Sequence, residues 1–123
     1  MSTIQVFARR HRLKVRTDPK DSTPIIVGRF GHLYQVADQL LGVMVMPPKS
    51  SARYWNAAQA KLLEARFVIL QDGDYEGSAS FNPDDPAQAR LAIKIAGAKR
   101  KRTISAERRE QLIALLRSRR GKA

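Results

Sequence analysis

Four consecutive cations, Lys99, Arg100, Lys101 and Arg102, lie between a glycine and the start of a helical pattern. Neighbouring like charges repel one another, and this cost is offset when an anion binds close by. Nucleic acid supplies such anions, because each phosphate that a cation neutralises releases condensed counterions. A solvated linker that only keeps the protein soluble is the alternative interpretation. The run predicts a clamp on a phosphate backbone.

The tail after this run continues the positive charge. Residues 98–123 hold ten basic and two acidic residues, against thirteen and nine in residues 1–97. Guanidinium groups pair with phosphate through two parallel hydrogen bonds, which a merely solubilising surface does not require. We therefore include the arginines of the tail among the predicted phosphate contacts: Arg108, Arg109, Arg117, Arg119 and Arg120.

A second basic cluster lies near the N-terminus, in the stretch RRHRLKVR. An extended segment over residues 13–16 would direct Leu13 and Val15 inward and the cations outward on one face. A half-buried strand with an ordinary solvated face would show the same alternation. The candidate phosphate contacts here are Arg9, Arg10, Arg12, Lys14 and Arg16, with Arg29 added from further along the chain.

The stretch GRFGHLY interleaves aromatic and basic side chains beside two glycines. Aromatic rings can stack on bases while cations hold the phosphates. Aromatic residues in strands are more often packing residues. The sequence therefore favours a hairpin with its turn at Gly31 and with Phe30 in the core.

Three carboxylates alternate along QDGDYEG: Asp72, Asp74 and Glu76. On one face of a strand they could hold Mg²⁺ or Ca²⁺, and a basic protein with such a site would resemble a metal-dependent nuclease. The Asp-Gly pair is, however, a hairpin-turn signal, and the spacing does not fit a calcium-binding loop. The pattern favours a turn, and the nuclease stays as a third hypothesis.

The scarcity of other reactive side chains narrows the function further. The chain has no cysteine, which excludes disulfides and thiol catalysis, and its two histidines argue against a mainly histidine metal site. Neither His11 nor His32 neighbours a nucleophile, so we expect both in surface or turn positions. No glycine motif that cradles phosphate is present. The sequence predicts no catalytic residue, no metal site, no cofactor and no enzyme activity.

Size and charge indicate the class of partner. The 123 residues suit one domain, and the net charge of +12 places nucleic acid ahead of an acidic protein surface. The longest apolar run, LLGVMVM, is too short to span a bilayer. With no apolar leader pattern, we expect a cytoplasmic protein that does not engage a membrane.

The elements that must position these residues form an α+β pattern. Residues 1–97 are expected to form a compact body: a small antiparallel sheet of about five strands packed with two helices. Apolar and alternating runs predict strands over residues 25–30, 31–36, 40–46, 67–71 and 78–81, with 13–16 as the half-buried strand described above.

Helical periodicity predicts a short helix from Ile4 and two longer ones in the body. Ser50 or Ser51 can cap the first long helix. The second has Asp85 as its cap, Pro86 as its first residue, Gln88 as capping-box partner and Gly97 as its end.

A basic C-terminal helix over residues 105–120 completes residues 98–123. Its apolar stripe is too short to fold alone, so it must dock on the body, on another copy or on a partner.

Together these patterns predict a small basic nucleic-acid-binding protein that contacts the phosphate backbone through its C-terminal arm and its N-terminal cluster. The main alternative is a protein-interaction module or small inhibitor that docks on an acidic protein or a nucleoprotein complex.

Overall fold

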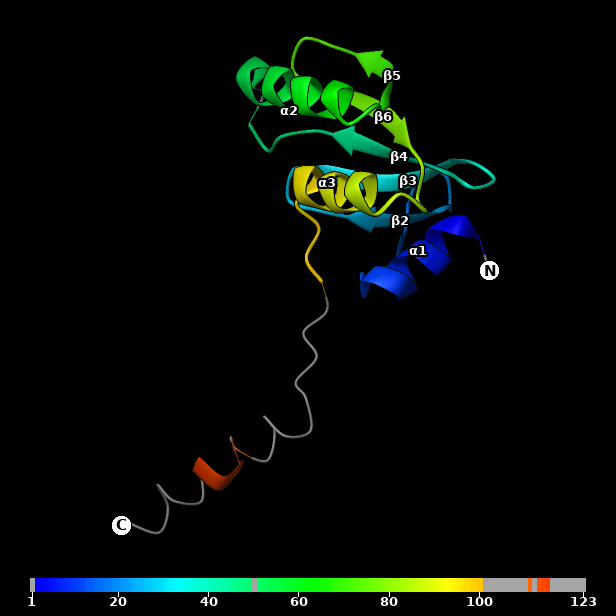
Figure 1. Ribbon diagram of the computed structural model, residues 1–123, viewed down its shortest axis with the longest axis vertical. Helices are drawn as coiled ribbons and strands as arrows, with labels where there is room; N and C mark the ends of the chain where they lie inside the picture. Colours follow the sequence, from blue (N-terminus) through cyan, green and yellow to red (C-terminus); the bar gives the residue numbers. More distant parts are fainter. Residues whose placement is uncertain (1, 50, 101–110, 112, 116–123) are drawn as a thin grey trace.

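The computed structural model describes residues 2–49, 51–100, 111 and 113–115, and shows a six-stranded antiparallel sheet with helices packed on it (Figure 1). The α+β class is confirmed, and the sheet has one strand more than the five expected. The elements in chain order are α1 (Thr3–His11), β1 (Arg16–Thr17), β2 (Pro24–Val27), β3 (Gly31–Ala37), β4 (Leu40–Val45), α2 (Ala52–Glu64), β5 (Val68–Asp72), β6 (Gly77–Phe81) and α3 (Pro86–Ala96).

The strands lie in the order β1-β2-β3-β4-β6-β5. The first four follow one another as a meander; α2 then carries the chain to the far edge, and β6 returns between β5 and β4. The register aligns Leu33 with Ile26 on one side and with Val43 on the other, and Val43 with Ala79. Paired residues of antiparallel strands point to the same face, so these side chains form one apolar row.

The helices cover the face on which this row lies. α1 contacts β2, β3 and β4, α2 contacts β5, and α3 contacts β3 and β4. Figure 1 shows the three helices following one another along the molecule. Their buried side chains join the strands in a single apolar core, whose largest members are Trp55 of α2 and Phe7 of α1. The opposite face of the sheet contributes no apolar side chain to this core.

The helix ends follow from local sequence, as expected. The hydroxyl of Ser51 accepts a hydrogen bond from the backbone of Tyr54, which identifies the cap of α2. The carboxylate of Asp85 accepts from the backbone of Ala87 and caps α3, and Pro86 is the first helical residue. Gly97 ends α3 in the left-handed conformation, at φ 71°.

Gln88 is not the capping-box partner that the sequence suggested. Its Oε1 accepts from the backbone N–H of Asn82 at 2.8 Å, and its Nε2 donates to the carbonyl of Ala65 at 2.9 Å. The side chain of Gln88 is buried, and it bonds to the backbone of the residues that follow α2 and β6 rather than to the cap of its own helix.

Two strand boundaries also differ from the prediction. The strand expected over residues 13–16 is β1 at Arg16–Thr17, because pairing with β2 begins only where Arg16 meets Ile25. Leu13 instead forms an isolated antiparallel bridge with Arg100. The expected turn at Gly31 lies at residues 28–30, and Gly31 is the first residue of β3.

Little of the expected C-terminal helix lies in the described residues. Gln111 and residues 113–115 are helical, and Ile113 and Leu115 are exposed. The rest of residues 105–120 lies outside the described part of the chain. In that part, no helix is both long enough and apolar enough to cross a bilayer.

Candidate nucleic-acid interface

Two segments that are far apart in sequence meet at one end of the sheet. The bridge between Leu13 and Arg100 brings the residues after α3 alongside the residues after α1. Between them lies a shallow depression of about 300 Å³, and the turn before β3 forms another of its walls. Four of the predicted phosphate contacts line this depression: Lys14, Arg16, Arg29 and Lys99.

A second depression, of about 540 Å³, adjoins the first on the side of α1 and shares Lys14 with it. Arg9 and Arg12 line it as well. Among the described residues that line the two depressions there is no Asp or Glu. We call the six cations around them the basic cluster: Arg9, Arg12, Lys14, Arg16, Arg29 and Lys99.

The backbone holds Arg29 against the end of α3. Its N–H donates to the carbonyl of Gly97 at 3.2 Å, and the N–H of Phe30 donates to the carbonyl of Ala96 at 2.9 Å. The approach is so close that a Cβ on Gly28 would overlap the carbonyl oxygen of Ala96. These non-local bonds fix the backbone of the turn that carries Arg29.

An aromatic stack supports the same turn. The ring of Phe30 stacks on Tyr54 of α2 with centroids 4.8 Å apart, and the guanidinium of Arg29 lies 5.4 Å from the Phe30 centroid. The hydroxyl of Tyr54 donates to the carbonyl of Ile95 at 2.9 Å. Phe30 is half-buried and packs on Tyr54, but it is not a member of the apolar core in which the sequence placed it.

Two cations beside the basic cluster act on His11, a histidine that the sequence placed at the surface or in a turn. His11 ends α1, its ring lies 4.4 Å from that of Phe7, and its Nε2 is buried with no hydrogen-bond partner. Burial lowers the pKa of His11, and the positive charges of Arg100 and Arg10 lower it further. Burial first, and the two cations second, therefore favour the neutral form of His11.

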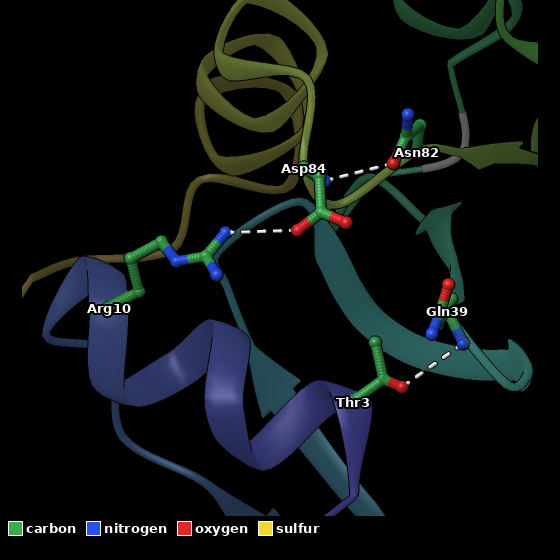
Figure 2. A network of polar contacts seen from close by, with 5 residues as sticks. All are labelled: Thr3, Arg10, Gln39, Asn82 and Asp84. Carbon is green, nitrogen blue, oxygen red and sulfur yellow. Dashed lines mark hydrogen bonds and ion pairs between the residues drawn. The ribbon is translucent and has the colours of Figure 1, made fainter.

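Arg10 does not line either depression, although the sequence grouped it with Arg9 and Arg12. Its Nη1 donates to Asp84 at 3.2 Å in an exposed ion pair (Figure 2). Successive residues of a helix point in different directions, and Arg10 points to the loop before α3 rather than to the depressions. Figure 2 also shows the N–H of Gln39 donating to the hydroxyl of Thr3, a second tie of α1 to the body.

Arg100 follows Lys99 at the Leu13 bridge and is exposed. The other predicted contacts lie outside the described residues: Lys101, Arg102, Arg108, Arg109, Arg117, Arg119 and Arg120.

The alternating carboxylates of residues 72–76 do not converge. Asp72 accepts from Trp55 Nε1 at 2.9 Å and from Gln59 Nε2 at 3.0 Å, and these bonds, that of Trp55 first, lower the pKa of Asp72. The N–H of Gly73 donates to the carbonyl of Glu76 in a hairpin turn, as the Asp-Gly signal predicted. In the described part of the chain, no three His, Asp or Glu side chains are grouped to hold a metal ion.

Comparison with known proteins identifies no relative of this chain. No family model matches the chain, and neither the curated proteins nor the solved structures contain a significant match to it.

Proposed function

We propose that this protein binds the phosphate backbone of nucleic acid through the basic cluster. One observation carries the proposal: four cations from three separate segments line one depression, and no carboxylate is among its described lining residues. Such a grouping is electrostatically unfavourable until an anion neutralises it. Binding makes and breaks no covalent bond, so the proposed role is not enzymatic.

The shape of the site favours a polyanion over a single small anion. The two depressions adjoin one another and are open, which suits successive phosphates along a strand more than one enclosed ion. Arginine offers a planar fork of donors to each phosphate, and lysine adds charge. Backbone contacts of this kind give affinity and orientation without reading sequence.

The C-terminal arm extends the same contact in this proposal. Lys99 lines the first depression, and Arg100 follows it at the bridge with Leu13. The next basic residues in the sequence are Lys101 and Arg102, and the arginines of the tail come after them. Because the proposed partner is nucleic acid, we propose that the protein is located in the cytoplasm.

The experiment is a binding series with short DNA and RNA, single-stranded and duplex, over a range of salt concentrations. We expect the affinity to fall steeply as salt rises, because binding releases counterions from the nucleic acid. Absence of binding even at low salt would overturn the proposal, and the basic cluster would then be assigned to an acidic protein surface.

A further inference from the structure

The face of the sheet opposite the helices, which we call the open face, is hollowed. The hollow measures about 950 Å³ and spans from the loop before β2 to β5 at the far edge. The register places His32 beside Met44 and Met44 beside Ser78 across its floor. Its exposed or half-buried apolar lining includes Ile25, Tyr34, Val36, Met44 and Leu70.

The charge of the hollow is opposite to that of the molecule. Three carboxylates line it, Asp18, Asp21 and Asp38, and none of its described lining residues is Lys or Arg. In a chain of net charge +12, a surface of this kind repels phosphate and attracts a basic partner. An apolar floor with acidic residues around it suits an amphipathic helix with a basic side.

The sequence of the chain itself predicts such a helix. Residues 105–120 carry four aliphatic residues within five positions, Leu112, Ile113, Leu115 and Leu116, among the arginines of the tail. Of these, Ile113 and Leu115 are 45% and 58% exposed. A short amphipathic helix is marginal in water unless its apolar side is covered.

The arm can reach the open face. Arg100 lies beside Leu13, three residues before Arg16, and Arg16 pairs with Ile25, which lines the hollow. The path from Arg100 to Ile25 crosses two strand pairings of about 5 Å each and follows the chain for three residues of about 3.3 Å each. Arg100 therefore lies roughly 20 Å from Ile25 along this path. Residues 101–104 can span roughly 16 Å when extended, and a helix that begins at residue 105 adds roughly 10 Å before its first leucine, Leu112.

We propose that residues 105–120 dock as a helix on the open face of the same molecule. Leucine and isoleucine side chains cover the apolar floor, and the arginines face Asp18, Asp21 and Asp38. The docked arm and a bound nucleic acid then compete for the same arginines. The docking does not depend on the proposed function, and its test needs no nucleic acid.

The absence of cysteine from the chain allows a direct test in the full-length protein. Leu115→Cys on the arm is combined with Val36→Cys on the open face, and the product is treated with a short thiol-to-thiol cross-linker. The matched control combines Leu115→Cys with Leu63→Cys, an exposed leucine on α2, in the layer of helices. All three substituted side chains are exposed, so the fold should survive each change.

We expect the open-face pair to form the intramolecular cross-link about tenfold faster than the control, because docking raises the local concentration of one thiol at the other. Equal rates in the two pairs would overturn the proposal. Cross-linked dimers in place of the intramolecular product would also overturn it, and would assign the face to the arm of a second copy.

Adding Ile113→Ser and Leu116→Ser to the open-face pair separates docking from random encounter. These changes remove apolar area from the arm and leave its arginines intact, so we expect the rate to fall to that of the control. An unchanged rate would contradict apolar docking on the floor of the hollow.

Discussion

Arg29 is held by contacts that its own neighbourhood in the sequence does not contain. Its charge and its position beside an aromatic residue marked it as a candidate contact. Its N–H, however, bonds to Gly97, and the Phe30 ring beneath it stacks on Tyr54. Both partners come from helices later in the chain, so residue types predicted the candidate but local pattern could not predict how it is held.

The pKa of His11 reports the charge of Arg100, which follows Lys99 of the basic cluster. We expect Arg100→Gln to raise this pKa, because the substitution removes a cation that disfavours the protonated ring. Histidine titration by NMR measures the change. His32 is the internal reference, because burial lowers its pKa and its charged neighbour is Asp18. A His11 pKa that stays the same or falls would contradict the placement of Arg100.

The same two histidines give stability a pH dependence of known sign. Their pKa values are lower in the folded protein than in the unfolded chain. The unfolded state therefore binds more protons as the pH falls through about 6.5, and the free energy of unfolding declines from that point downward. We expect His11→Gln with His32→Gln to make this decline shallower in denaturant unfolding. An identical slope in the variant would show that other groups cause it.

At the scale of the element, the end of α3 shapes the site. In Gly97→Ala, the alanine must adopt a φ of 71°, and its Cβ would lie 2.9 Å from Cδ2 of Phe30. We expect the free energy of unfolding to drop by about 1–2 kcal/mol from the left-handed conformation alone. Denaturant unfolding measures it, with Lys94→Ala on the exposed side of α3 as the control. A loss no larger than that of the control would contradict the tight turn against α3.

Gln88 joins α3 to two other segments. We expect Gln88→Leu to lower the free energy of unfolding by about 1–3 kcal/mol, because it leaves the backbone groups of Asn82 and Ala65 unpaired in a partly buried place. Gln59→Leu removes a single bond to exposed Asp72 and should cost less. If the two variants lose equal stability, the buried bonds of Gln88 do not have the assigned role.

Elements were predictable wherever a local signal sets them. Ser51, Asp85 and Gly97 were identified as helix ends because caps act within a few residues. The strand expected at residues 13–16 was displaced because its boundary depends on pairing with Ile25 and Arg100, which alternation along one segment does not contain. The role of Gln88 was missed for the same reason.

For the whole molecule, the topology separates two surfaces of opposite charge. The bridge between Leu13 and Arg100 gathers the basic cluster at one end of the sheet, while Asp18, Asp21 and Asp38 line the hollow of the open face. The net charge predicted an anionic partner, and the sequence located the basic segments. It could not show that the segments after α1 and α3 meet, nor that the acidic residues share a face, because both follow from the order of the strands.

In the proposed function, the basic cluster is a phosphate site because of its position and not because of net charge alone. The cluster variant carries Lys14→Gln, Arg16→Gln, Arg29→Gln and Lys99→Gln. The control carries the same number of changes of the same two residue types at exposed positions of α2 and α3: Arg53→Gln, Lys61→Gln, Arg90→Gln and Lys94→Gln. Both lower the net charge from +12 by four.

The most direct measurement is the affinity of both variants and of the unchanged protein for the same duplex over a salt series. In the cluster variant we expect the logarithmic salt slope to become shallower by about 3 to 4, as four phosphate contacts would require, while the control keeps nearly the original slope. Equal losses in the two variants would contradict phosphate binding at the basic cluster, because they would show that binding follows net charge and not this site.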